Sequence, residues 1–180
     1  MIKIALGHNK NRWLFLITAL LILCAAAAQA APLRTVTATI TKITDGDTVQ
    51  AVTPEGTKLK VRLYGIDAPE TAKGKIPGEP FGNDAQNYLA TLVGQQTVRI
   101  EIRDVDRYRR MVAILWLEDR NVNQEMISAG MAEAYVEYLK QPYRTPFIQA
   151  EQKAKAQAKG IWSQGNNYER PSQFRRRMGS

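Results

Sequence analysis

Three short segments rich in valine, isoleucine and threonine follow one another between Thr35 and Tyr64, and two turn signals separate them. The first signal is Asp45-Gly46 and the second is Pro54-Glu55-Gly56, both typical of tight turns between strands. In the third segment, residues 58–64 alternate apolar and charged side chains, which is the period of a half-buried strand. The sequence therefore predicts three antiparallel strands at the start of the folded part.

The rest of the chain alternates between helical and strand patterns. Residues 67–80 contain three prolines and two glycines and predict a loop. Further strands are predicted over residues 98–102 and 111–117, and helices over residues 83–93, 123–129 and 145–159. The first helix is expected to be capped by Asn83 or Asp84 and to end at Gly94. Five short strands with a helix after the third predict an α+β, mainly β fold: a five-stranded Greek-key OB-fold barrel with about three helices.

The N-terminus has the pattern of a secretory signal peptide over residues 1–30. A basic stretch, Lys10-Asn11-Arg12, precedes an apolar run over residues 13–24, and Ala28-Gln29-Ala30 offers a cleavage site. The apolar run is shorter than the roughly 18 to 20 residues that span a bilayer, so a cleaved signal peptide is favoured over a retained membrane anchor. We expect one folded domain over residues 31–163, export to the periplasm or beyond, and no stable membrane insertion after cleavage.

The only histidine and the only cysteine, His8 and Cys24, lie in this leader. Without them a mature chain lacks disulfides, thiol nucleophiles, Ser-His pairs and the usual zinc ligands. Acid-base chemistry must then come from carboxylates, lysine, tyrosine or metal-bound water.

The leader also carries three cations, Lys3, Lys10 and Arg12, so its removal lowers the net charge from +8 to +5. A basic chain favours polyanions, and nucleic acid, an anionic membrane surface and simple solubility all remain open. Residues 164–180 are polar and arginine-rich and are predicted to be a disordered basic tail.

Two acidic motifs stand at strand ends. Asp47 follows the first turn, and Asp67 follows the third predicted strand. Each alone is explained by a turn or a backbone hydrogen bond. In a barrel, however, these strand ends can meet, and two carboxylates with a backbone carbonyl suit Ca²⁺.

Three more residues can join the two acids. Glu70 lies three residues after Asp67, Arg62 lies on the third strand, and Arg110 precedes the fifth. Taken separately, Glu70 is explained as a helix-capping or surface acid, and each arginine is explained as a solvated strand residue. Together they can hold a phosphodiester, stabilise its developing charge and activate water.

Several separated motifs resemble the staphylococcal nuclease (thermonuclease) family over roughly Thr39 to Ser163. They are Asp45-Gly46-Asp47-Thr48-Val49, residues 61–71 (VRLYGIDAPET), Asp106-Arg107-Tyr108-Arg109-Arg110, Gly130-Met131-Ala132 and residues 158–162 (AKGIW). The resemblance implies an OB-fold endonuclease, a hydrolase that cleaves DNA and RNA with Ca²⁺ and leaves 3′-phosphate and 5′-hydroxyl ends. Single-stranded substrates and a monomer without protein partners are expected.

By position, the resemblance implies roles for nine residues. Asp47, Asp67 and the carbonyl of Ala68 match the calcium ligands, Arg62 and Arg110 match the arginines that clamp the phosphate, and Glu70 matches the general base. Arg107 and Tyr108 match positions that hold the nucleotide phosphate. Tyr138 matches an aromatic position beside the base or sugar, with core packing as its alternative, and Tyr135 is a second candidate of the same kind.

Two departures from the family pattern bear on the site. Arg109 stands where the family commonly has a glycine, so either Arg109 or Arg110 can be the clamp, and register favours Arg110. Residues 72–80 also differ from the lysine-rich loop of the family's best-known member, and we expect substrate preference to follow that loop.

Two other functions compete with catalysis. A noncatalytic OB module would bind single strands through a basic groove and stacked aromatics, but three acids beside a polyanion repel it unless a cation intervenes. A tail that tethers the chain to anionic lipid is the other alternative, although this tail is short and lacks an apolar face.

Overall fold

The computed structural model describes residues 32–179, and its first strand, β1 (Arg34–Asp45), pairs with two different neighbours. The first half of β1 is antiparallel to β5 (Thr97–Val105), and the second half is antiparallel to β2 (Thr48–Val52). Two register shifts in the β1–β2 ladder bend the strand between these partners, as bulges do in barrels. One long strand thus contributes to two sides of the sheet.

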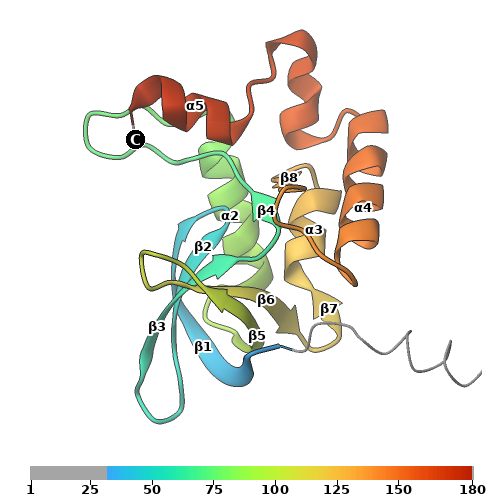
Figure 1. Cartoon of the computed structure of the whole chain (residues 1–180). Coiled ribbons are helices and arrows are strands. Elements are labelled where there is room, and N and C mark those ends of the chain that lie inside the picture. Colours follow the sequence, from blue (N-terminus) through green and yellow to red (C-terminus); the bar gives the residue numbers. More distant parts are fainter. Residues whose placement is uncertain (1–31, 180) are drawn as a thin grey trace, which may run out of the picture. The chain divides into compact units, whose positions relative to one another are not determined.

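A parallel pairing closes the sheet into a barrel. β3 (Lys58–Leu63) is antiparallel to β2, β6 (Met111–Leu117) is antiparallel to β5, and β3 and β6 pair with each other in parallel. The closed order β1-β2-β3-β6-β5 confirms the predicted five-stranded OB-type barrel (Figure 1). The short strand β7 (Arg120–Asn121) extends the sheet beyond β6.

A separate two-stranded ribbon lies outside the barrel sheet. It consists of β4 (Ile66–Asp67) and β8 (Glu133–Ala134), paired antiparallel so that Asp67 lies opposite Glu133. Each strand has only two residues, so an alternating pattern in the sequence could not predict either of them. The ribbon matters because it carries one of the predicted calcium ligands.

Residues 32–179 contain five helices, where the sequence predicted about three. The three predicted helices correspond to α2 (Gly82–Val93), α3 (Val122–Ser128) and α4 (Arg144–Ala156). The additional two are the 3₁₀ segment η1 (Gly160–Asn167) and α5 (Pro171–Met178). No helix in this part of the chain is long and apolar enough to cross a bilayer.

Helix α2 packs against β1 through apolar residues spaced at helical intervals. Ala85, Leu89 and Val93 are fully buried and belong to the main core, as expected for side chains four residues apart on one face. The predicted end at Gly94 is confirmed. The predicted cap is wrong, because Asn83 and Asp84 lie inside the first turn and the N-cap is Phe81.

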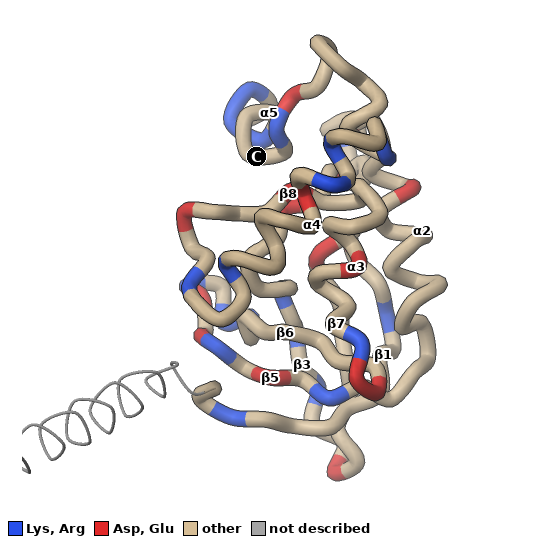
Figure 2. Tube along the Cα trace, turned by 90° about the vertical axis from the view of Figure 1, so that its right-hand side faces the viewer, with Lys and Arg blue, Asp and Glu red and all other residues tan. Residues whose placement is uncertain are grey.

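The predicted disorder of residues 164–180 is at variance with the structure, which places Pro171–Met178 in helix α5. Two tail side chains, Pro171 and Phe174, are buried, and the arginines of α5 form one basic stretch (Figure 2). Composition alone suggested disorder because Asp67 and Glu70, the acids that pair with Arg175, lie far away in the sequence. The predicted signal peptide over residues 1–30 lies outside the described residues.

Candidate active site

The fold brings together Asp47, Arg62 and Asp67, which lie in the β1–β2 turn, on β3 and on β4. Asp47 lies in the β1–β2 turn. Arg62 lies on β3 directly opposite Thr48, the residue that follows Asp47. The Leu63 N–H donates to the Asp47 carbonyl at 2.8 Å, which joins the end of β3 to that turn. Asp67 follows on β4, five residues after Arg62.

The guanidinium of Arg62 bridges the two aspartates. One terminal nitrogen pairs with Asp47 Oδ2, and the other donates to Asp67 Oδ1 at 2.8 Å. Asp47 Oδ2 also accepts from the Ala68 N–H at 3.0 Å, and Asp47 Oδ1 accepts from Thr48 Oγ1 at 2.8 Å. The sequence predicted this convergence, and the structure shows it.

Both aspartates are removed from solvent, with exposed fractions of 1% for Asp47 and 0% for Asp67. Buried carboxylates need compensating positive charge. Burial opposes the charged form of Arg62, yet the pKa of its guanidinium is raised because Asp47 and Asp67 face it. Arg62 therefore stays charged and supplies positive charge beside both buried side chains.

Glu70 is held at the edge of this cluster by cations. Lys73 pairs with Glu70 Oε2 and, at 3.0 Å, with Asp45 Oδ2. Burial opposes the charge on Lys73, but these hydrogen bonds raise its pKa. Asp45 also accepts from Thr71 Oγ1 at 2.7 Å, so the loop that carries Glu70 is tied to the end of β1.

A second glutamate supports the backbone of Glu70. The Glu70 N–H donates to Glu79 Oε1 at 3.2 Å, and the Glu79 N–H donates to the Glu70 carbonyl at 2.9 Å. Burial raises the pKa of the Glu79 carboxyl to about 7, although the Glu70 backbone hydrogen bond and the charge of Arg175 oppose the rise. Glu79 is therefore partly protonated near neutral pH.

The predicted basic cluster occupies the turn between β5 and β6, and Asp106 organises it. Asp106 Oδ1 accepts from the Tyr108 and Arg110 N–H groups, each at 2.9 Å, and Asp106 Oδ2 accepts from Arg110 Nε at 2.7 Å. Burial opposes ionisation of Asp106, but these bonds to Arg110 and Tyr108 lower its pKa. The guanidinium of Arg110 is thus oriented by a carboxylate outside the Asp47–Asp67 pair.

Strand pairing relates Arg110 to Arg62. Arg110 immediately precedes β6, whose first residue Met111 lies beside Val61 and whose second, Val112, lies beside Arg62. Arg109 adopts a φ of 62°, in the left-handed region that favours glycine. The assignment of Arg110 rather than Arg109 as the clamp stays a prediction.

The remaining predicted residues lie on the surface. Tyr108 and Tyr138 are exposed by 64% and 61%, and this exposure contradicts the core-packing alternative for Tyr138. The Arg107 guanidinium lies over the Tyr108 ring at 4.9 Å, and the Tyr135 and Tyr138 ring centroids are 4.8 Å apart. Exposed aromatic rings such as those of Tyr108 and Tyr138 suit the binding of unpaired bases.

Sequence reasoning missed three side chains that contact Glu70 or the aspartates: Lys73, Glu79 and Arg175. Lys73 lies three residues after Glu70, and this spacing was a usable signal. Glu79 lies in a loop without periodicity. Arg175 comes from α5 and bonds Asp67 across 108 residues of sequence, so no local pattern indicates it.

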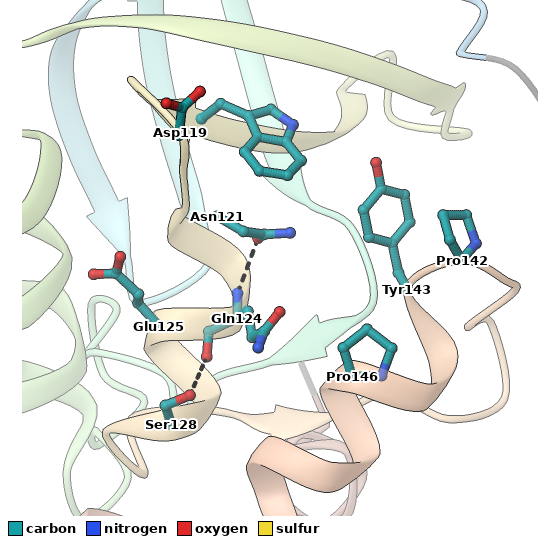
Figure 3. Close-up of a pocket in the computed structure, with 9 residues that line it drawn as sticks. Asp119, Asn121, Gln124, Glu125, Ser128, Pro142, Tyr143 and Pro146 are labelled. Atoms are coloured by element: carbon teal, nitrogen blue, oxygen red, sulfur yellow. Dashed lines mark hydrogen bonds between the residues drawn. The ribbon is translucent and has the colours of Figure 1, made fainter.

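A groove elsewhere on the barrel does not contain the predicted site. It has a volume of about 440 Å³ and lies between β6, β7, α3 and the start of α4 (Figure 3). Trp116, Tyr143 and Pro146 contribute its apolar surface. None of the nine predicted site residues lines it, so the acids and arginines lie outside this groove.

The predicted calcium ligands are oxygen atoms, which are the donors that hard cations such as Ca²⁺ bind. Asp47 and Asp67 supply buried carboxylates, and the Ala68 N–H donates to Asp47 Oδ2. Within residues 32–179, no group of three or more histidine, cysteine or acidic side chains is arranged to hold a metal. The fit therefore depends on two carboxylates with a backbone oxygen, and guanidinium groups at both aspartates show that the position attracts positive charge.

Comparison with known proteins decides the family. The family model for staphylococcal nuclease homologues matches residues 60–164, more than half of the chain. The chain belongs to the staphylococcal nuclease family. The matched residues include Arg62, Asp67, Glu70 and Arg110 and end before α5.

Individual members of the staphylococcal nuclease family are similar along most of the chain. An "uncharacterized endonuclease" of Haemophilus influenzae is 39% identical over 78% of this chain and 73% of its own length. A "thermonuclease" of Staphylococcus hyicus is 32% identical over 69% of this chain and 74% of its own. A "micrococcal nuclease" of Shigella flexneri is 34% identical over 76% and 79%.

Proposed function

We propose that the chain is a calcium-dependent endonuclease that hydrolyses DNA and RNA, preferring single strands and leaving 3′-phosphate and 5′-hydroxyl ends. Its broader class, a hydrolase of phosphodiester bonds, follows from membership of the staphylococcal nuclease family. The observation that supports the finer proposal is the Arg62 bridge between two buried aspartates, next to the loop that carries Glu70.

In this proposal Asp47, Asp67 and the Ala68 carbonyl hold the cation. A bound calcium ion supplies positive charge that neutralises the acids and favours approach of the phosphate. Arg62 and Arg110 donate paired hydrogen bonds to phosphate oxygens, where negative charge develops in the transition state. Asp106 binds Arg110 through Nε, so it orients the guanidinium.

Glu70 takes the role of general base, since no histidine lies in the proposed mature chain. Its carboxylate accepts a proton from water as the water oxygen bonds to phosphorus. The bond from phosphorus to the 5′ oxygen breaks, and that oxygen takes up a proton from solvent, which produces the 3′-phosphate and the 5′-hydroxyl. Tyr108 and Tyr138 present exposed rings on which unpaired bases can stack, and this supports the proposed preference for single strands.

Hydrolysis of single-stranded DNA by the purified protein tests the mechanism. With Ca²⁺ we expect turnover that a chelator abolishes, and we expect Glu70→Gln to lower kcat by roughly 10² to 10⁴. Arg62→Ala should lower kcat by roughly 10² or more, as removal of one charge-stabilising donor does. Glu55→Gln is the matched control, because Glu55 lies exposed in the β2–β3 turn.

Three results would contradict parts of the proposal. Equal turnover in chelator would exclude the calcium mechanism. Products with 5′-phosphates would exclude the proposed leaving group. Binding of single strands without turnover under any divalent metal would instead support the noncatalytic OB module.

We further propose that residues 1–30 direct export and are removed. The basic, apolar and small-residue regions of this segment support the proposal. N-terminal sequencing of the protein recovered from outside the cytoplasm should begin at Ala31. Recovery of the full-length chain in the cytoplasm would contradict it.

A further inference from the structure

The C-terminal segment is anchored to the ribbon that carries Asp67. Glu133 lies opposite Asp67 in the β4–β8 pairing and is only 3% exposed. Its carboxylate accepts from the Tyr168 hydroxyl at 2.8 Å and from Arg170 Nε at 2.9 and 3.1 Å. These bonds compensate a buried acid, and they fix the segment that leads into α5.

Helix α5 extends from this anchor toward the candidate active site. Pro171 and Phe174 are buried at its inner face, and the next residue is Arg175. Arg175 Nη2 donates to Asp67 Oδ1 at 3.0 Å and to Asp67 Oδ2 at 2.8 Å, while Nη1 donates to Glu70 Oε1 at 3.2 Å. One guanidinium thus binds a proposed calcium ligand and the proposed base together.

These contacts occupy the carboxylates of Asp67 and Glu70, which the proposed reaction needs. Both oxygens of Asp67 accept hydrogen bonds, since Oδ1 also accepts from Arg62. Both oxygens of Glu70 are paired, one with Arg175 and one with Lys73. A divalent cation and the Arg175 guanidinium therefore compete for the same carboxylate charge.

We propose that α5 is an autoinhibitory element: Arg175 occupies the carboxylates of Asp67 and Glu70, and the helix must withdraw before a divalent cation binds and Glu70 becomes free to act. The inference rests on the proposed function, because it concerns the regulation of the same site. A cation that binds only the withdrawn form has its apparent affinity reduced by the fraction of molecules in that form.

Calcium binding to the full chain, measured by titration calorimetry, tests the inference without relying on activity. Arg175→Ala should bind Ca²⁺ about tenfold more tightly than wild type, because the competing charge-assisted bonds are lost. Arg176→Ala is the matched control, since it removes the same charge from the next, exposed position of α5. It should bind Ca²⁺ as wild type does.

Hydrogen exchange provides a second, independent readout. In wild type, saturating Ca²⁺ should increase exchange of the α5 amides at least about tenfold, while the β5–β6 amides stay protected. Equal calcium affinity of Arg175→Ala and Arg176→Ala, or α5 protection unchanged by Ca²⁺, would overturn the autoinhibitory role.

Asp67→Asn separates failure of this inference from failure of the proposed function. If Asp67→Asn loses calcium binding and Arg175→Ala gains none, the site holds a cation and only the autoinhibition is wrong. If Asp67→Asn binds calcium as wild type does, Asp67 is not a ligand, and both proposals are wrong. A tighter Arg175→Ala together with a weaker Asp67→Asn supports both.

Discussion

Replacement of Gly46 by alanine tests why a glycine stands between Asp45 and Asp47. The Gly46 φ lies outside the left-handed region, so the backbone accepts alanine. An added Cβ, however, would lie 2.6 Å from Ala85 Cβ and 2.8 Å from Ala68 Cβ. The glycine therefore allows α2 to approach the turn, rather than allowing an unusual turn conformation.

The cost of Gly46→Ala follows from these distances. Packed carbons are ordinarily about 3.5 to 4.0 Å apart, so each contact is too short by about 1 Å. Both opposing atoms are β-carbons that cannot rotate away, and Ala85 is anchored in α2. Overpacking of this kind costs about 1–3 kcal/mol, and we expect the upper half of that range.

Urea denaturation followed by circular dichroism measures this loss. Calcium affinity should fall as well, because relief of the clash displaces Ala68, whose N–H bonds to Asp47. Gly56→Ala is the control: Gly56 has open space around it but a φ of 84°. It should lose about 1 kcal/mol from backbone strain alone and keep its calcium affinity.

A compensating substitution refines the test. Ala85→Gly removes the nearest clashing atom, although a glycine inside a helix itself costs about 1 kcal/mol. The double variant should therefore be more stable than the sum of the two single losses implies. Wild-type stability of Gly46→Ala, or strict additivity with Ala85→Gly, would refute the close-approach argument.

Three further substitutions have defined expected outcomes. Asn123 is fully buried and bonds to the backbone of Leu115, Tyr64 and Ala113, so Asn123→Ala should lower the free energy of unfolding by about 2–3 kcal/mol in urea; a loss under 1 kcal/mol would contradict this role. Glu79 has a folded-state pKa of about 7, raised from 4.5. Between pH 4.5 and about pH 7 the native state therefore retains a proton that the unfolded state releases, so the free energy of unfolding falls as the pH rises through this window. Glu79→Gln should leave the free energy of unfolding unchanged near pH 4 and raise it by up to about 2 kcal/mol at pH 8, after allowance for solvent screening; a pH-independent difference from wild type would contradict the titration. Arg109→Gly should stabilise the protein by up to about 1 kcal/mol, because Arg109 has a φ of 62°, and the melting temperature should rise; a fall would show that the Arg109 side chain contributes more than its backbone strain costs.

The sequence by itself determined the barrel and the core of the site. Alternating strands and turn signals are local properties, and Met111–Leu117 forms β6 as predicted. Antiparallel register then dictates that Arg62 lies beside the Asp47 turn. The convergence of these two residues with Asp67 could therefore be inferred before any contact was known.

Other features depended on contacts that local sequence does not encode. The two-residue strands β4 and β8 exist only because each provides the other with a partner. The short distance from Gly46 to α2 arises from helix packing.

Helix α5 shows the difference most clearly. Its residues have the composition of a disordered tail, and as an isolated segment of eight residues it is too short to form a stable helix. It is ordered by the burial of Phe174 and by pairing of Arg175 with Asp67 and Glu70, two acids that lie far away in the chain. The tertiary structure thus decided the surroundings of Asp67 and Glu70, because Arg175, which contacts both, comes from the C-terminal helix.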